Sequence, residues 1–325
     1  MSRIMQSALS PAAAEAAHIY HLWRVFLCVM VAIYVLVAIV LFIAILRNRN
    51  RATDETGMEL IAEPKQASER RATHVVSTLV IVTVLILFAL LIADFFTGNA
   101  IYATPDPNAL SIKITGHQWW WEVEYQDPQP SEVMTTANEI HVPVGKPVKL
   151  ELQSTDVIHS FWVPNINGKK DLVPGHPTTT WFTGNRAGEF RGQCAEYCGE
   201  QHAHMRMVFV AQSRDAFGDW LKAQKKSAAE PRTESQRRGR EVFLAAQCVM
   251  CHTIQGTNAR ARLGPDLTHI GSRIMIGAGE FPNTRGYLAG WISNASALKP
   301  GARMPPNQLS SDDLNALLDY LESLK

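Results

Sequence analysis

The chain has 325 residues, a formal net charge of +1, and 46% hydrophobic and 19% charged residues. This length permits more than one domain, and the balanced charge, without a basic aromatic-rich segment, argues against a nucleic-acid-binding protein. The average hides an uneven distribution, because residues 25–46 and 75–93 contain no charged side chain.

The two uncharged runs are long enough to cross a lipid bilayer as helices. At a rise of about 1.5 Å per residue they span about 33 Å and about 28 Å, against roughly 30 Å for a bilayer core. They predict a transmembrane helical hairpin over residues 22–97, preceded by an N-terminal tail at residues 1–21. Arginine and lysine are frequent in the connecting loop at residues 47–73. The positive-inside rule therefore places this loop in the cytoplasm and both chain termini on the periplasmic side of a bacterial inner membrane.

The part of the chain after the hairpin begins with short segments that are typical of β-strands. Residues 110–125, 139–164 and 205–211 alternate apolar and polar side chains or are rich in β-branched residues, and turns such as VGKP and GNRAG interrupt the series. We therefore expect an antiparallel β-sandwich over residues 98–221.

The composition changes again after the expected sandwich. Residues 222–236 are polar and charged, which is typical of a flexible linker. Residues 237–325 contain three helical patterns, and the last of them starts with serine at the expected N-cap and continues with leucines at helical spacing. These patterns predict a small all-α domain at the C-terminus.

Two cysteines and a histidine of the C-terminal domain form the sequence Cys-Val-Met-Cys-His. The C-x-x-C-H spacing predicts that one haem is attached covalently through Cys248 and Cys251, with His252 as an iron ligand. Two other readings fit less well, because a redox-active dithiol is expected in a βαβ setting and a zinc site needs two further ligands.

The sixth iron ligand should be a methionine or histidine further along the chain. Met304, in a proline-rich loop before the last helix, is the expected ligand, and a His/Met pair suits electron transfer because it leaves no open position on the iron. Met275 and His269 are the alternatives.

Residues 194–205, with the sequence CAEYCGEQHAHM, bring soft donor atoms into one short segment. A disulfide between Cys194 and Cys198 is the default for paired cysteines in an oxidising compartment, but it would not explain His202 and Met205. Thiolate, imidazole and thioether donors together favour copper over zinc, calcium or magnesium. A mononuclear blue-copper site uses one cysteine, so two cysteines suggest two copper ions that share bridging thiolates.

The pattern C-x-E-x-C-x-x-x-H-x-x-M in this segment resembles the binuclear copper (CuA) site of cytochrome c oxidase subunit II. Two further segments, VIHSFWVP at residues 157–164 and GHQWWW at residues 116–121, are similar to the same family. The resemblance implies a cupredoxin-like domain. It also implies a copper ligand set in which Cys194 and Cys198 bridge the ions, His159 and His202 each bind one ion, and Met205 and the backbone carbonyl of Glu196 are weak axial ligands.

The same resemblance implies two further roles. Trp119, the first tryptophan of GHQWWW, takes the place of the family's electron-entry residue. The side chain of Glu196 helps to hold a magnesium ion at the border with subunit I. His204 has no place in the copper pattern, and we interpret it as a surface residue or as a residue that contacts the copper ligands without binding copper.

The chain departs from the family at two positions. His74 stands near the place of a glutamate at the mouth of a proton path, and Glu69 is an alternative carboxylate for that path. His176 replaces an arginine that contacts subunit I in the family.

Residues 237–325 resemble class I cytochrome c through the segments GREVF, GPDL and RMP. The resemblance implies that the carbonyl of Pro265 holds the ring of His252. It also implies that Trp291 packs near the haem edge, although a plain core position explains this tryptophan equally well.

The chain as a whole resembles the subunit II of caa-type haem-copper oxidases, which carries a fused cytochrome c. The resemblance implies a subunit that passes electrons through haem c to the binuclear copper centre and on to haem in subunit I, where oxygen is reduced to water with proton translocation. The implied partners are subunit I, subunit III, the lipid bilayer, and a cytochrome c or a quinol:cytochrome c reductase as electron donor. Two alternatives remain: the electron-entry subunit of a copper-containing nitric-oxide reductase, or a membrane-anchored electron carrier.

Overall fold

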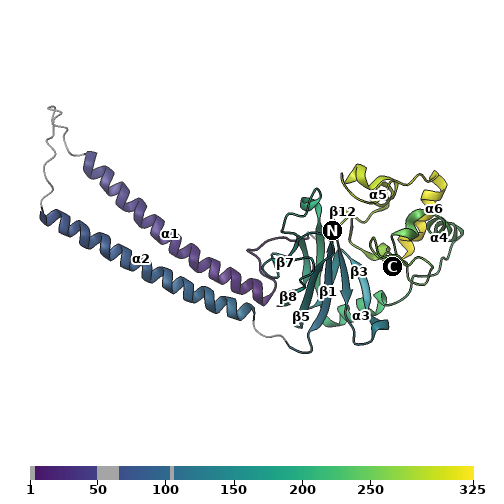
Figure 1. The fold of residues 1–325 in the computed structure, drawn as a ribbon, viewed down its shortest axis with the longest axis horizontal. Helices are drawn as coiled ribbons and strands as arrows, with labels where there is room; N and C mark the ends of the chain where they lie inside the picture. The colour runs from purple at the N-terminus through teal and green to yellow at the C-terminus, as the bar shows by residue number, and fades with distance from the viewer. Residues whose placement is uncertain (1–3, 50–65, 103–105) are drawn as a thin grey trace. The chain divides into compact units, whose positions relative to one another are not determined.

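The computed structural model describes residues 4–49, 66–102 and 106–325. The chain divides into two compact units, His18–Ile101 in one and Met1–Ala17 together with Tyr102–Lys325 in the other. The first unit is helical, and the second contains a β-sandwich and a group of shorter helices (Figure 1). This architecture confirms the predicted fold class.

The first unit is formed by two long helices, α1 (Ala14–Arg49) and α2 (Gln66–Ile101), of 36 residues each, except that the first four residues of α1 belong to the second unit. Each contains a stretch that is long and apolar enough to cross a membrane. The side chains along these stretches are uncovered, as Phe42 and Leu85 show with exposed fractions of 63% and 62%. At about 54 Å, each helix exceeds the thickness of a bilayer core, so its polar ends continue beyond the uncharged run. Residues 50–65 of the predicted loop lie outside the described residues.

The predicted β-sandwich is confirmed and consists of two five-stranded sheets. The first has the order β3-β2-β1-β5-β8, with β3 (Met134–Ala137), β2 (Trp120–Tyr125), β1 (Leu110–His117), β5 (Pro147–Ser154) and β8 (Thr178–Thr183). The second has the order β4-β10-β9-β6-β7, with β4 (Glu139–Pro143), β10 (Arg206–Gln212), β9 (Gly188–Cys194), β6 (His159–Trp162) and β7 (Lys170–Leu172).

The sandwich is mixed rather than purely antiparallel. The β1–β5 and β4–β10 pairs are parallel, and the other neighbours are antiparallel. The strand period does not reveal direction, because side chains alternate between faces in both cases. Along β5 that alternation buries Val148, Leu150 and Leu152. The same rule separates Trp120 from Trp121 in β2, since Trp121 is fully buried while Trp120 is partly exposed, whereas Trp119 lies in the turn before β2.

The N-terminal tail joins the edge of the sandwich. Met5 forms a β-bridge with Phe190, and Ala13 forms one with Gly184. The side chains of Ala12 and Ala13 are buried. Tail and sandwich thus fold as one unit, while residues 1–3 lie outside the described part of the chain.

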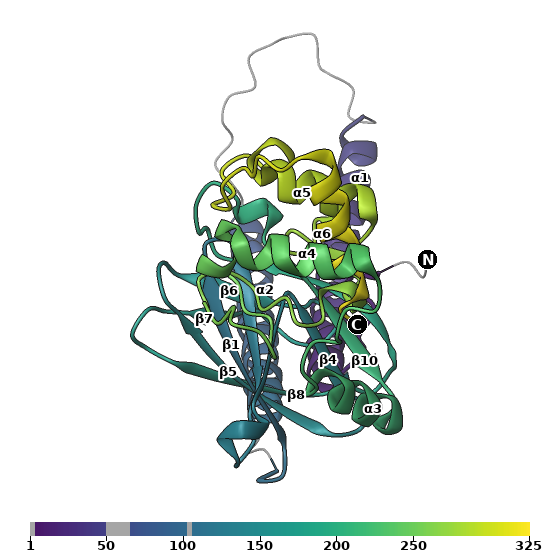
Figure 2. The same cartoon turned by 90° about the vertical axis from the view of Figure 1, so that its right-hand side faces the viewer.

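The C-terminal domain is helical, as predicted (Figure 2). Thr233 and Gln236 form a capping box at the start of α4, and Ser310 caps α6. These caps satisfy backbone N–H groups that have no partner inside the helix. The elements are α4 (Glu234–Ala245), α5 (Arg285–Leu298), α6 (Ser311–Ser323), the short strands β11 (Met275–Ile276) and β12 (Phe281–Pro282), and two 3-10 turns, η3 (Gln247–Met250) and η4 (Ile270–Ser272).

Helices α4 and α6 cross at Gly239, where a side chain has no room. A Cβ atom at this position would lie 2.0 Å from the carbonyl oxygen of Ala316 and 2.8 Å from Cβ of Tyr320. We expect Gly239→Ala to force the helices apart and to lower the free energy of unfolding of this domain by about 1–3 kcal/mol. Thermal unfolding followed by circular dichroism measures this change.

The matched control is Gly286→Ala in α5, because nothing lies within 4 Å of a Cβ atom there. Alanine at an open helical position should leave the domain as stable as before or slightly more stable. Equal thermal unfolding temperatures for the two variants would contradict the close crossing of the helices at Gly239.

The segment between sandwich and C-terminal domain is shorter than the predicted linker at residues 222–236. Helix α3 (Arg214–Gln224) includes its first residues and α4 includes its last, so residues 225–233 alone lie between the two helices.

This segment also makes polar contacts with the domains on both sides of it, which the prediction did not include. Nζ of Lys225 forms ion pairs with Asp127 at 3.3 Å and Glu132 at 3.0 Å in the sandwich. The backbone N–H of Ala228 donates to the carbonyl of Gln255 in the helical domain at 3.0 Å. A polar composition does not distinguish a solvated segment from one whose charged groups find partners in the fold.

Candidate metal and haem sites

Two neighbouring strands bring the predicted copper ligands together. His159 begins β6 and Cys194 ends β9, and these strands pair in the second sheet. Cys198 lies in the loop after β9, which returns through the 3-10 turn η2 (His202–His204) to β10. His159, Cys194 and Cys198 are buried, and their possible ligand atoms all lie within 4.8 Å of one another.

The two thiols are close but not joined. Their Sγ atoms are 3.7 Å apart and both cysteines are free, whereas a disulfide bond is about 2.05 Å long. Nδ1 of His159 lies 3.9 Å from Sγ of Cys194, and Nδ1 of His202 lies 3.6 Å from Sγ of Cys198. One imidazole therefore faces each thiol.

Two weaker donors complete the cluster. Sδ of Met205 lies 3.9 Å from Sγ of Cys198, and the carbonyl oxygen of Glu196 lies 3.3 Å from Sγ of Cys194. Met205 has no exposed surface. The fold thus brings together all six residues of the predicted copper set, and buried sulfur and imidazole donors suit a soft metal such as copper.

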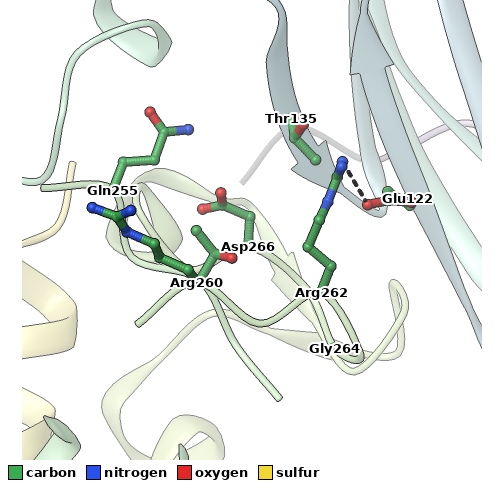
Figure 3. Close-up of a pocket in the computed structure, with 8 residues that line it drawn as sticks. Glu122, Thr135, Gln255, Arg260, Arg262, Gly264 and Asp266 are labelled. Atoms are coloured by element: carbon green, nitrogen blue, oxygen red, sulfur yellow. Dashed lines mark hydrogen bonds and ion pairs between the residues drawn. The ribbon is translucent and has the colours of Figure 1, made fainter. Parts of the chain in front are cut away.

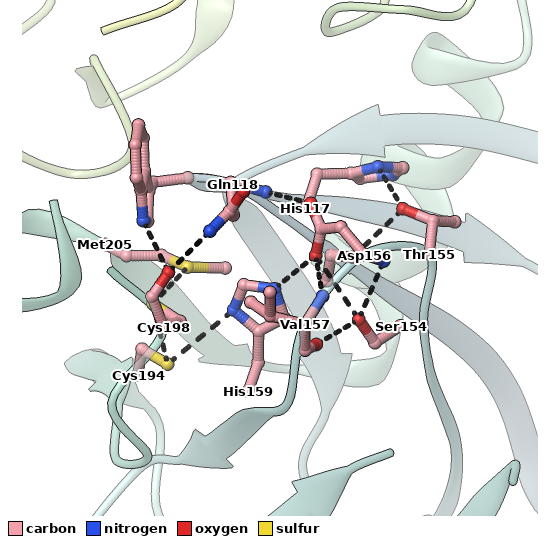
Figure 4. Close-up of polar contacts among 12 residues, drawn as sticks. His117, Gln118, Ser154, Thr155, Asp156, Val157, His159, Cys194, Cys198 and Met205 are labelled. Atoms are coloured by element: carbon pink, nitrogen blue, oxygen red, sulfur yellow. Dashed lines mark hydrogen bonds and ion pairs between the residues drawn. The ribbon is translucent and has the colours of Figure 1, made fainter. Parts of the chain in front are cut away.

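A carboxylate that the sequence analysis missed orients His159. Oδ1 of Asp156 lies 2.8 Å from Nε2 of the imidazole, while Nδ1 faces the thiols (Figure 4). Asp156 also accepts hydrogen bonds from the backbone N–H groups of Gln118 at 2.6 Å and Val157 at 2.7 Å. A proton on Nε2 held by this carboxylate leaves the Nδ1 lone pair free for a metal ion. The position of Asp156, three residues before His159, was the sequence signal available.

The carboxyl group of Asp156 stays ionised at ordinary pH. Burial raises its pKa, but the hydrogen bonds from His159 and from two backbone N–H groups outweigh burial and hold the pKa at about 2. The interaction with His159 is therefore fully present above the ordinary pKa of 3.8 and is lost as the pH falls towards 2.

The two thiols do not ionise alike. The hydrogen bond between them lowers the pKa of Cys194 and raises the pKa of Cys198, and the imidazole of His159 lowers the pKa of Cys194 further. Cys194 is therefore the thiol that loses its proton more readily, and a metal ion that binds both sulfur atoms must displace any proton that remains on Cys198.

The carboxylate of Glu196 points away from the thiols towards the surface. Its Oε2 lies 3.2 Å from Nζ of Lys169, and both side chains are about half exposed. An exposed ion pair of this kind is weak, so it can give way to another cation.

Two side chains of the first sheet reach the copper loop. Nε2 of Gln118 and Nε1 of Trp119 both donate to the carbonyl oxygen of Cys198, at 2.8 Å and 3.0 Å. The next residue, Gly199, has a φ of +112° and would place a Cβ atom 3.2 Å from the indole of Trp119. Glycine therefore permits both the turn and the close approach of the indole.

The second site is a cavity of about 770 Å³ in the C-terminal domain, open towards the sandwich. Its volume lies in the range of cofactor sites. From the sandwich it is lined by residues that include Gln118, Trp119 and Gln201. From the helical domain it is lined by the whole predicted haem set, Cys248, Cys251, His252, Pro265, Trp291 and Met304.

The ring of His252 is oriented and protonated in a way that suits a metal ligand. Its Nδ1 lies 2.7 Å from the carbonyl oxygen of Pro265, as predicted, and a carbonyl can only accept, so Nδ1 carries the proton. Burial lowers the pKa of His252, which keeps the imidazole neutral with Nε2 available for iron. Of the alternative sixth ligands, Met275 lines the cavity, whereas His269 does not and its Nε2 is engaged by the carbonyl of Lys226 at 2.9 Å.

Arg273 is a second residue that the sequence analysis missed. It lines the cavity, and its Nη2 donates to the carbonyl of Asp266. Its Nε atom is buried and has no hydrogen-bond partner among the described residues. An unpaired guanidinium N–H is costly, and it suits a carboxylate of a group bound in the cavity. The sequence signal that could have identified Arg273 is that it is the one charged residue in the segment SRIMIGAG.

The remaining predicted residues lie elsewhere. His176 is exposed, and its backbone N–H donates to Val173. His74 and Glu69 are exposed near the start of α2. His204 pairs with Glu280 of the C-terminal domain at 3.2 Å, so it is an interdomain contact rather than a free surface residue.

Comparison with known proteins assigns both domains. The family described as cytochrome c oxidase subunit II, periplasmic domain, matches residues 110–212, and the cytochrome c family matches residues 236–325. Cytochrome c oxidase subunit 2 of Alkalihalophilus pseudofirmus is 34% identical over 98% of this chain and 91% of its own length. The Bacillus subtilis protein of the same name is 28% identical over 98% and 92%.

A solved structure is similar to the sandwich. It is the periplasmic domain of subunit II of cytochrome oxidase of Bradyrhizobium japonicum, at 33% identity, covering 37% of this chain and 96% of that chain with a TM-score of 0.34.

The fold and the two sites define a membrane-anchored electron-transfer subunit with a cupredoxin-like copper domain and a cytochrome c domain. The chain belongs to the cytochrome c oxidase subunit 2 family, in the form with a fused cytochrome c. It is the electron-entry subunit of a haem-copper oxidase, and both families imply bound copper and haem c.

Proposed function

We propose that electrons cross this subunit from haem c in the helical domain, by way of Trp119, to a binuclear copper centre in the sandwich, and leave it for haem in subunit I. The position of Trp119 carries the proposal. Its side chain lines the haem cavity and also donates a hydrogen bond to the carbonyl of Cys198. One residue therefore contacts both sites.

The residues of the sandwich fit a binuclear copper centre. Cys194 and Cys198 would bridge two copper ions, with one imidazole, from His159 or His202, on each ion, and with Met205 and the carbonyl of Glu196 as weak ligands. Two coppers that share thiolates can take up and release a single electron. The chain itself excludes water by burial, anchors two ligands on adjacent strands, and fixes the ring of His159 through Asp156.

The cavity of the helical domain fits one haem. Cys248 and Cys251 would hold it by thioether bonds, and His252 and Met304 would bind the iron. The haem supplies a one-electron carrier with no open coordination position. The unpaired Nε–H of Arg273 supports the fit, because haem carries carboxylates that can accept a hydrogen bond from it.

We place subunit I and subunit III beside this chain in the membrane, with a cytochrome c or a quinol:cytochrome c reductase as donor. The tail folds with the sandwich, and one helix separates the tail from the loop at residues 50–65. Tail and sandwich therefore share one side of a membrane that α1 and α2 cross, which supports two spans with both redox domains in the periplasm. The carboxylate of Glu196 would leave Lys169 to bind magnesium at the border with subunit I.

Metal and haem analysis of the purified complex tests the proposal. We expect two copper ions and one covalent haem on this chain, recovery together with a large haem-containing membrane subunit, and oxygen consumption with reduced donor. The proposal would be overturned if the paired cysteines were found as disulfides and the chain held neither copper nor haem. Recovery of the chain alone, fully loaded, would favour a membrane-anchored carrier.

Asp156 gives a separate prediction for the copper site. Asp156→Asn should lower copper affinity about 10- to 100-fold, because an amide holds the Nε2 proton of His159 less firmly than a carboxylate. Competition with a copper chelator measures the change. Asp215→Asn, an exposed position at the start of α3, is the control; equal affinities in both variants would contradict the role of Asp156.

A further inference from the structure

The loop that carries Met304 also touches the copper loop. Lys299, just after α5, has an exposed fraction of 4%. Its Nζ donates to the carbonyl of His204 in the copper loop at 2.8 Å and to the carbonyl of Gly277 in its own domain at 3.0 Å. Beside it, the side chain of Gln201 donates to the carbonyl of Pro300. One end of the loop therefore bonds to the copper loop at His204, which lies between the predicted copper ligands His202 and Met205 in the sequence.

The other end of the same loop lies on Trp119. The guanidinium carbon of Arg303 is 5.5 Å from the centre of the indole ring, and its Nη2 donates to Oε1 of Gln118. A guanidinium over an indole face is attracted by the electrons of the ring. Both Gln118 and Trp119 donate in turn to the carbonyl of Cys198. Arg303 thus connects Met304, its neighbour in the chain, with the side chains that hold the copper loop.

A buried lysine is costly unless its charge is well bonded. Burial lowers the pKa of Lys299 to about 8, with Glu280 opposing and Arg206 adding to this effect. The group is therefore an ammonium ion at neutral pH, and its two carbonyl partners belong to different domains. If the two domains separated slightly at this point, the buried ammonium group would lose one of its two hydrogen bonds, which would cost free energy.

Other contacts keep the same two surfaces together. Nη2 of Arg262 bonds Glu124 at 2.7 Å and Glu122 at 3.2 Å, beside a polar cavity of about 240 Å³ between the domains (Figure 3). The carboxylate of Glu139 accepts from the backbone N–H of Ile274 at 2.8 Å. These contacts lie away from the loop at 299–304, so the loop contacts can be removed while the domains stay together.

We propose that Lys299 and Arg303 are positioning residues that fix the Met304 loop against Trp119 and the copper loop, and thereby set the rate of electron transfer between haem c and the copper centre. The inference rests on the proposed function. The step would move one electron, because oxidation of ferrous haem to ferric haem would be balanced by reduction of the copper pair by one electron, and no further reactant would be needed. Neither residue belongs to the predicted ligands, and their printed partners are His204, Gly277, Gln118 and Trp119, so each would act through the loop that it holds.

The test uses the full chain in its complex with three variants, Lys299→Met, Arg303→Gln and Arg303→Lys. Methionine preserves most of the length of the buried side chain, and lysine preserves the charge of Arg303 without its planar group. Arg238→Gln is the charge-matched control, because Arg238 pairs with Asp313 inside the helical domain. Copper and haem spectra and both midpoint potentials are measured first, and we expect them to be unchanged in every variant.

Two readouts then decide the proposal. In hydrogen exchange, amides of residues 196–204 should exchange about tenfold to a hundredfold faster in Lys299→Met and Arg303→Gln, as loss of a hydrogen bond from a charged donor predicts. Flash-induced electron transfer from haem c to copper should slow at least about tenfold, because small displacements of reacting centres have large effects on rate. Arg303→Lys should fall between Arg303→Gln and the unchanged chain.

Exchange and transfer rates equal to those of Arg238→Gln would overturn the proposal. Faster exchange with an unchanged transfer rate would also overturn it, because the contacts would then hold the loop without setting the rate. A different outcome, no transfer between haem and copper in the unchanged chain, would contradict the proposed function, and hydrogen exchange would still show whether Lys299 and Arg303 hold the loop.

Discussion

Replacing Cys198 with serine is expected to abolish the binuclear copper signal in near-infrared absorption and electron spin resonance, while the absorption of haem c persists. Sγ of Cys198 lies 3.7 Å from Sγ of Cys194, 3.6 Å from Nδ1 of His202 and 3.9 Å from Sδ of Met205. It is therefore the atom that the other donors surround. A serine hydroxyl is a hard donor that remains protonated, so it cannot replace a bridging thiolate.

The matched control for this experiment is Cys28→Ser. Cys28 is an exposed cysteine of α1 and belongs to the other compact unit, so both signals should be retained. An intact binuclear signal in the Cys198 variant would contradict the bridging role. Loss of both copper and haem signals would indicate misfolding, and the folded state of the haem domain is then checked by its helical circular dichroism.

Replacing Met304 with alanine is expected to leave the haem attached and to lower its midpoint potential by roughly 0.2 V, a fraction of the approximately 0.8 V range that axial ligands control. The covalent bonds to Cys248 and Cys251 do not depend on this side chain, whereas a thioether ligand stabilises ferrous iron. Redox titration of the haem band measures the potential. Electron transfer from the donor should slow accordingly, because the variant haem is harder to reduce.

Two other methionines that line the cavity show whether a fall in potential comes from loss of the sixth iron ligand. Met250 lines the cavity but is 68% exposed, so Met250→Ala should change the potential little. Met275 is buried, lines the same cavity and was the alternative ligand. If Met275→Ala gives the large fall in potential and Met304→Ala does not, Met275 is the sixth ligand and the assignment of Met304 is wrong.

The features that could be predicted from the sequence are those whose chemistry depends on residues only a few positions apart. Covalent haem attachment needs two thiols and an imidazole within five residues, so C-x-x-C-H is informative without a fold. The copper loop places two thiols, an imidazole and a thioether within twelve residues, and the structure confirms that they converge. The apolar runs of the helices and the alternation of the strands follow equally from local side-chain periodicity.

Several features depended on contacts between distant segments. Lys225, at the start of the linker, forms ion pairs with the sandwich, because Asp127 and Glu132 lie beside it in the fold. The parallel pairing of β1 with β5 follows from the path of the chain and not from strand sequence. Arg273 and Asp156 were missed because a charged side chain with buried polar contacts looks like a surface residue in the sequence until its surroundings are known.

The sequence by itself determined the class of each domain and the two long apolar helices, and it predicted the donor atoms, because these follow from side-chain chemistry repeated or spaced within a few residues. The tertiary structure alone decided how His159 is oriented, which residues hold Cys198 from the opposite sheet, and how Lys299 and Arg303 fasten one domain to the other. Asp156 lies only three residues before His159, but the contacts that hold Cys198 and that join the two domains connect residues 79 to 185 positions apart, such as Trp119 with Cys198 and Gln118 with Arg303. No local pattern encodes them, since they arise only when packing of the two sheets and the helices brings the segments within hydrogen-bonding distance.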